Sequence, residues 1–116
     1  MIAVIFEVTP AEGRMDEYLD HAARLRAALE TMPGFVSVER FRSLTNPEKL
    51  LSLSFWKDEA AVAGWRNHWA HRESQRAGRA GVFAGYRLRV AAMLRDYGKD
   101  EGRDRAPSDS NAAWGI

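Results

Sequence analysis

The stretch from Trp65 to Gln75 holds the side chains best suited to chemistry. His68 and His71 are three positions apart, and His71 and Gln75 are four apart, so each pair shares one face if this stretch is helical. A neutral imidazole can act as a general base near cellular pH, which makes His71 the candidate base. The indole of Trp65 offers a flat wall to an aromatic ligand, and His68 is a further candidate contact. A plainer interpretation stays open, in which Trp65 fills the core and the histidines lie at the surface or cap a helix.

These residues do not predict a metal or phosphate site. The chain has no cysteine, which removes thiolate ligands and cysteine nucleophiles. No Asp, Glu or third His joins the two histidines at ligand spacing, and Glu73 is two positions from His71, on the wrong side of a helix. Gly78, Gly81 and Gly85 precede a strand and not a helix, so they do not present a phosphate-binding loop. We therefore expect no metal ion and no cofactor.

Further candidates lie around the last predicted strand. Phe83 and Tyr86 flank the expected mouth of the layer between helices and sheet, where they line a pocket or fill core. Arg87, Arg89 and Arg95 alternate on one side of this strand. Arginines so placed can orient an anionic or phenolate oxygen, although an exposed set paired with acids is the simpler explanation. Phe83, Tyr86 and Arg87 are the candidate substrate-binding residues here.

The hydrophobic spacing defines the elements that must position these side chains. In order, they are a strand over residues 2–8, a helix ending near residue 31, and strands over 35–44 and 50–56. A helix then starts after Asp58, a helical segment resumes around His71 and fades at Gly78 or Gly81, and a strand covers residues 86–97. The order is β-α-β-β-α-β, which predicts an α+β fold of ferredoxin-like type with a four-stranded antiparallel sheet. Both helices cover one face of that sheet.

The other face of the sheet cannot be purely polar, because the strands carry apolar residues on both sides. Leu51 and Leu53 point away from Ser52, and Phe35 is expected to share a face with Phe41. An exposed apolar sheet is a docking surface, and a second copy related by a two-fold axis would cover it. We therefore expect a homodimer through the open sheet face.

Composition limits the function classes. The 116 residues are 46% hydrophobic and carry a formal net charge of +1, without the basic excess of a nucleic-acid-binding module. No apolar run approaches the roughly 20 residues of a membrane helix, and the N-terminus lacks the features of a signal peptide, so a cytoplasmic protein with no membrane partner is expected. Residues 1–97 are predicted to form one domain. Residues 98–116 are charged and polar, and we expect a tail or dimer arm with Trp114 as its anchor.

The segment from Leu51 through Phe55-Trp56, the acidic helix start at Asp58-Glu59, Trp65 and His71-Arg72 resembles the antibiotic biosynthesis monooxygenase domain family, as does the turn Pro33-Gly34-Phe35. The resemblance covers roughly residues 1–97. It implies a dimeric α+β barrel. It also implies, for some members, cofactor-independent oxidation of phenolic or anthrone-like polyketides by O₂, in a pocket lined by a tryptophan at the position of Trp65.

A related haem-degrading branch also carries a tryptophan at the position of Trp65. It needs an axial histidine where this chain has Gln75, and an asparagine where this chain has Phe6. His71 lies one helical turn from Gln75 and could substitute as a ligand. We expect a small monooxygenase that oxidises a phenolic, quinol or polyketide-like molecule with O₂, with His71 and Trp65 as the catalytic candidates. Haem binding and degradation is one alternative, and a non-enzymatic small-molecule-binding or stress-associated dimer is another.

Overall fold

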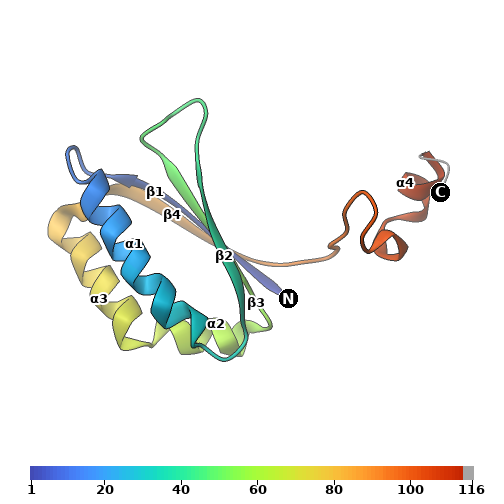
Figure 1. Cartoon of the computed structure of the whole chain (residues 1–116), viewed down its shortest axis with the longest axis horizontal. Helices are drawn as coiled ribbons and strands as arrows, with labels where there is room; N and C mark the ends of the chain where they lie inside the picture. The colour runs from blue at the N-terminus through green and yellow to red at the C-terminus, as the bar shows by residue number, and fades with distance from the viewer. Residues whose placement is uncertain (114–116) are drawn as a thin grey trace.

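The computed structural model describes residues 1–113, except for the side chains of residues 69, 70, 74, 77, 78 and 111–113. The elements are β1 (Ile2–Pro10), α1 (Met15–Glu30), β2 (Phe35–Arg42), β3 (Leu50–Trp56), α2 (Glu59–Arg66), α3 (Trp69–Ala77), a π-helical turn (Gly78–Val82), β4 (Phe83–Ala92), a 3-10 turn (Arg103–Arg105) and α4 (Ser108–Ala113). Figure 1 shows α1, α2 and α3 beside the sheet, and the chain after β4 running away from it.

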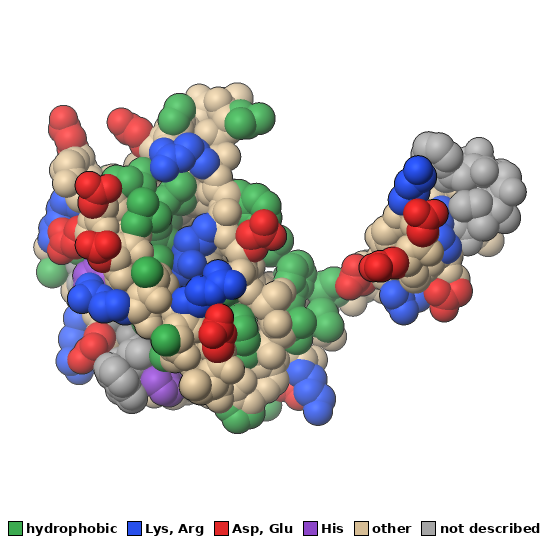
Figure 2. All heavy atoms as spheres, viewed as in Figure 1, with side chains coloured by type: hydrophobic (Ala, Val, Ile, Leu, Met, Phe, Trp, Pro, Cys, Tyr) green, Lys and Arg blue, Asp and Glu red, His purple; other side chains and the backbone are tan. Residues whose placement is uncertain are grey.

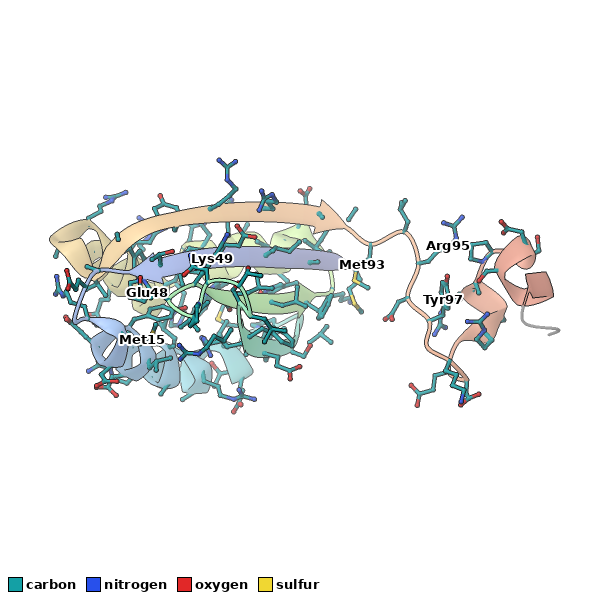
Figure 3. All side chains as sticks on the ribbon, turned by 90° about the horizontal axis from the view of Figure 1, so that it is seen from above. Met15, Glu48, Lys49, Met93, Arg95 and Tyr97 are labelled. Carbon is teal, nitrogen blue, oxygen red and sulfur yellow. The ribbon has the colours of Figure 1, made fainter. Side chains whose placement is uncertain are left out.

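The four strands form one sheet in the order β2-β3-β1-β4, and each neighbouring pair is antiparallel. Seen from above, α1 lies along one side of the strands (Figure 3). This confirms the predicted α+β arrangement of ferredoxin-like type. The two central strands, β1 and β3, pair over their whole shared length, from Ile2 opposite Trp56 to Val8 opposite Leu50.

Three strands differ from the prediction in their bounds. Strand β1 continues to Pro10, two residues beyond the expected end at Val8. The last strand was expected over residues 86–97, but β4 spans Phe83–Ala92 because its partner β1 extends only from Ile2 to Pro10. Strand β2 ends at Arg42, two residues earlier than expected. Strands β4 and β2 each end where the hydrogen-bonded neighbour ends, and alternation along one strand does not record that limit.

A bulge at the start of β2 corrects the predicted face of Phe35. Phe35 pairs with Trp56 and Ser37 pairs with Phe55, so Val36 is an extra residue. An extra residue reverses the alternation on one side of the bulge. Phe35 therefore packs edge-on against Trp56 on the helix side, with ring centroids 5.3 Å apart, and does not share a face with Phe41.

The helical region after Asp58 has two segments, as expected, and the second begins at Trp69, two residues before His71. Asp58 caps α2 as expected, because its Oδ1 accepts a hydrogen bond from the Ala61 amide at 2.9 Å. Helix α2 ends at Arg66, and His68 lies in the turn before α3.

The turn before β2 approaches α2 closely. Gly34 has a φ of +80°, and a Cβ placed there would lie 2.5 Å from the Cβ of Ala61. Its carbonyl accepts a hydrogen bond from the Lys57 amide at 2.8 Å. Glycine is therefore required at this position for both its backbone conformation and its size.

The core on the helix side is divided into two clusters. One contains Val8, Tyr18, Leu50 and Val82 and is joined by Phe6, Met15 and Phe83. The other contains Leu29, Val38 and Trp56 and is joined by neighbours that include Val4, Val62 and Trp65. The space between the two clusters is the cavity described below.

The opposite face of the sheet is not covered by a helix. The partly exposed apolar side chains on this open face are Ile5, Phe41, Leu51, Leu53 and Phe55. Glu7 lies among them and pairs with Lys49 at 3.3 Å and with Arg89 at 3.4 Å.

The chain after β4 folds on itself as it leaves the sheet (Figure 1). The Gly98 amide donates to the Glu101 carbonyl at 2.7 Å, and Arg105 Nε donates to the Asp96 carbonyl at 2.8 Å. The division between a domain over residues 1–97 and a tail over 98–116 stays a prediction, and Trp114, the expected anchor, lies outside the described residues. No helix in the described part of the chain is long and apolar enough to cross a membrane.

Candidate active site between the helices and the sheet

A cavity of about 570 Å³ lies between the helices and the sheet. Its floor is built from β1, β3, β2 and β4, and its roof from α1, α2, α3 and the π-helical turn. Cavities of this size accommodate drug-sized ligands. The lining is mainly apolar and aromatic, with a small number of polar and basic groups.

The floor is hollow because β3 carries serines where its neighbours carry larger residues. The strand register places Ser52 between Arg40 and Phe6. In the same way, Ser54 lies between Val38 and Val4. Two short side chains at the centre of the sheet leave space that Leu or Phe would fill, which explains why the core is divided.

One end of the cavity is a wall of stacked rings around Trp65. Its indole stacks on Trp56 at a centroid distance of 6.4 Å and an interplanar angle of 28°. His68 stacks on Trp65 at 5.5 Å and 20°, and the His71 ring lies 5.3 Å away at 58°. Trp65 and His71 line the cavity, whereas His68 packs on the indole and is not among the lining residues.

A second aromatic wall lies at the other end. Phe83 meets Phe6 at 5.9 Å, Tyr18 at 5.7 Å and Tyr86 at 6.2 Å between ring centroids. Phe6 also meets Tyr86 at 5.8 Å. A flat or chain-like apolar ligand would therefore contact aromatic surface at both ends of the cavity.

Burial shifts the pKa values of two titratable groups on the cavity wall. It lowers the pKa of His71 below the ordinary histidine value, and the positive charges of Arg72 and Arg66 act in the same direction. His71 is thus a neutral imidazole at pH 7, the form that accepts a proton. Burial raises the pKa of the Tyr18 hydroxyl, and the adjacent Arg40 opposes that rise. Tyr18 is thus a neutral phenol.

Three arginines line the cavity, namely Arg40 from β2, Arg66 from the end of α2 and Arg79 from the π-helical turn. Arg66 and Arg79 are exposed, while Arg40 is half-buried. Basic side chains are visible in the hollow beside α1, bordered by hydrophobic ones (Figure 2). No Asp or Glu is found among the described residues that line the cavity.

The structure brings most of the residues singled out from the sequence to this one place. Trp65, His71, Phe83 and Tyr86 all line the cavity. Arg87 does not, because it lies on the open face of the sheet, opposite Glu7 of β1.

Arg89 lies on the same open face and pairs with Glu7 at 3.4 Å. This ion pair agrees with the simpler explanation for the arginine, that of an exposed side chain paired with an acid. Gln75 and Phe6, the two positions that depart from the haem-degrading pattern, both line the cavity. Across the described residues, no three His, Cys, Asp or Glu side chains gather as a metal ion would require.

Sequence reasoning missed Arg40, Ser52, Ser54 and Tyr18 as cavity residues. A usable signal was present in β3, where Ser52 and Ser54 interrupt an otherwise apolar strand at alternate positions. Two small polar residues on one face of a central strand indicate a space above that face.

A comparison with known proteins identifies the family. The family model described as antibiotic biosynthesis monooxygenase matches residues 1–77. The chain belongs to this family. The expected family membership is thereby confirmed. SnoaB from Streptomyces nogalater, a solved structure with a similar fold, is a cofactor-independent oxygenase.

The relatives of this antibiotic biosynthesis monooxygenase domain span fungi and bacteria. A jasmonate monooxygenase of Pyricularia oryzae is 43% identical over 93 residues, which are 80% of this chain and 43% of that protein. The chain thus spans less than half the length of this relative. The Bacillus subtilis protein YqjZ is 30% identical over 93 residues, covering 80% of this chain and 79% of YqjZ. A variant of SnoaB shares the fold with a TM-score of 0.72 at 17% identity, covering 82% of this chain and 94% of SnoaB.

Proposed function

We propose that this protein is a cofactor-independent monooxygenase that oxidises a small phenolic, quinol or polyketide-like molecule with O₂ in the cavity between the helices and the sheet. The observation that carries the proposal is the position of the His71 ring on the wall of an aromatic cavity, with its centroid 5.3 Å from that of Trp65, where burial lowers the pKa of His71. A base and a flat apolar wall are what the deprotonation of an enolisable aromatic substrate requires.

The reaction can be written for a substrate with an activated CH₂ group. His71 takes one proton from this carbon, and the carbanion gives one electron to O₂. The substrate radical and superoxide then couple through a new C–O bond, and the peroxide takes up a proton from the His71 imidazolium. Loss of the remaining C–H proton breaks the O–O bond and yields a carbonyl and water. One O₂ is consumed, and the electrons come from the substrate.

The residues that line the cavity each have a part in this scheme. Trp65 and Trp56 hold a flat ring near His71, and the less exposed rings at the other end, Phe6, Tyr18 and Phe83, shield the opposite side of the ligand from water. Phe83 and Tyr86 are proposed substrate contacts, and His68 supports the indole of Trp65 by stacking on it.

Haem is not part of the proposal, because the donor set does not suit it. The cavity positions that the haem-degrading pattern fills with an axial histidine and an asparagine hold Gln75 and Phe6. Neither an amide nor a phenyl ring supplies the axial nitrogen that haem iron takes from histidine.

We also propose that the protein is a homodimer through the open sheet face. Leu53 and Ile5 lie opposite each other at the centre of that face, with partly exposed neighbours from β2 and β3 around them. A largely apolar patch on a sheet without a helix over it is favourable to bury against a second copy.

The test is oxygen uptake with a panel of quinols, anthrones and jasmonate, the last because of the name of the Pyricularia oryzae relative. We expect uptake with at least one compound and a loss of about 10²–10⁴-fold in the rate in His71→Ala, the usual range for removal of a general base. Trp65→Ala should also be strongly impaired, with Trp65→Phe retaining more activity.

His21→Ala is the matched control, since His21 lies on α1 with its Nδ1 3.1 Å from a nitrogen of Arg24, away from the cavity lining. Unchanged rates in both His71→Ala and Trp65→Ala would contradict this assignment. No uptake by the wild type, together with tight binding of the compounds, would favour the non-enzymatic alternative. A Soret band on addition of haemin, followed by consumption of haem with reductant, would overturn the exclusion of haem.

A further inference from the structure

The cavity has a marked charge bias that oxidation of a neutral phenol does not explain. Its described lining contains three arginines and no carboxylate. Two of them, Arg66 and Arg79, are exposed, where solvent hydrates and screens their charges. The third, Arg40, is half-buried, and it is the one whose surroundings point to a missing partner.

Arg40 projects from β2 into the cavity beside neutral groups. The register places it next to Ser52 on the floor, and it adjoins the hydroxyl of Tyr18 on α1. Its Nε is buried and has no hydrogen-bond partner among the described residues. A buried donor without an acceptor is unfavourable, so an acceptor supplied by a ligand would be bound there with a gain in stability.

We propose that the ligand of this cavity is an amphipathic carboxylate, bound with its carboxylate on the guanidinium of Arg40 and its apolar body between the two aromatic walls. This inference rests on the proposed function only in taking the cavity as the active site. The guanidinium presents parallel N–H donors that match the two oxygens of a carboxylate, and Nε is one of the donors in that fork.

A carboxylate fits this setting better than a phosphate. The only half-buried cation in the described lining is Arg40, and its neighbours Ser52 and Tyr18 are uncharged. One guanidinium balances one negative charge, whereas a phosphate monoester carries nearly two at pH 7. The exposed Arg66 and Arg79 attract the anion toward the cavity without fixing its orientation.

The experiment measures binding by calorimetry without any turnover. The probes are 1-naphthylacetate, its uncharged isostere 1-naphthylacetamide, and 1-naphthylmethyl phosphate. A fused bicyclic ring suits both aromatic walls, so the three probes differ only in the polar group. The variants are Arg40→Gln, Arg40→Lys and Arg26→Gln. Arg26 pairs with Glu30 at 3.2 Å on the exposed side of α1, so its substitution removes the same charge outside the cavity.

We expect wild type to bind the acid at least about tenfold more tightly than the amide, the ratio that one charge-assisted hydrogen-bond pair supplies. Arg40→Gln should abolish this preference while leaving amide binding within about twofold, and Arg26→Gln should keep it. If Arg40→Gln fails to fold, Arg40→Lys is decisive, because it keeps the charge but loses the fork and should retain only part of the preference.

Equal binding of acid and amide by wild type would overturn the proposal, as would an Arg40→Gln variant that still prefers the acid. Tighter binding of the phosphate than of the acetate would overturn the choice of a carboxylate. These outcomes do not depend on oxygen chemistry. A preference for the acid without oxygen uptake would refute the monooxygenase proposal alone. Uptake of oxygen without that preference would refute only the proposal that the ligand is a carboxylate.

Discussion

Replacing Ser54 by alanine tests the floor of the cavity. Trp56 is 1% exposed and is the largest fully buried side chain among the described residues. Its Nε1–H donates to Ser54 Oγ at 2.9 Å in a buried hydrogen bond. Alanine removes the acceptor but leaves the indole in place. The donor is then buried without a partner.

The magnitude follows from that geometry. An unsatisfied buried donor costs about 1–3 kcal/mol. For a chain of 116 residues, 1 kcal/mol corresponds to about 3–6 °C in the melting temperature, so a fall of roughly 3–18 °C is expected. The space left by the oxygen atom adds little to this loss of stability, because the cavity already adjoins this position.

The assay is thermal and urea denaturation followed by circular dichroism, with Ser52→Ala as the matched control. Ser52 lies on the same strand and face, and its hydroxyl makes no hydrogen bond to another described residue. We expect this control to change stability by no more than about 0.5 kcal/mol. If Ser54→Ala is no less stable than Ser52→Ala, the account of the indole hydrogen bond is refuted.

Three further predictions follow from the fold and the site. Because the pKa of His71 is lowered, the midpoint of the acid limb in the pH profile of kcat/KM should lie below pH 6.5, and this limb should be absent in His71→Gln. A midpoint at or above pH 6.5 would refute the argument that His71 acts as a neutral base. In urea denaturation, Gly34→Ala should lower the free energy of unfolding by about 1–3 kcal/mol more than Gly13→Ala, because both positions have a positive φ but only a Cβ at Gly34 would meet another atom at 2.5 Å. Equal losses in the two variants would show that backbone strain alone, and not the close contact, causes the effect. In sedimentation velocity, Leu53→Glu should be a monomer while Leu44→Glu, at a loop position that is 98% exposed, stays dimeric; a dimer in both would place the interface elsewhere.

The element order could be predicted from the sequence because it rests on local patterns. The spacing of Met15, Ala22 and Leu29 defines α1, and the Pro33-Gly34 turn ends it near the expected position. The features that could not be predicted are those that depend on pairing with another strand. The end of β4 depends on the length of β1, and the face of Phe35 depends on a bulge that only pairing with β3 reveals.

The same distinction applies to the residues of the candidate site. Trp65 and His71 could be singled out because aromatic and imidazole side chains at helical spacing are visible in one stretch of sequence. Arg40 could not, since it reaches the cavity by strand pairing with Ser52, and alternation does not say which face of a sheet the helices cover. Arg87 was selected on the same kind of alternation and lies on the other face.

One side of the cavity remains in contact with water along β4. Tyr86, Leu88 and Val90 line it, yet they are 68%, 54% and 49% exposed. A ligand lying against them would remove their apolar surface from water together with its own. Each further methylene that reaches this strand would then add about 0.8 kcal/mol to binding. The substrate would in this way form its own lid, so that the dryness of the reacting centre would grow with the length of the molecule bound in it.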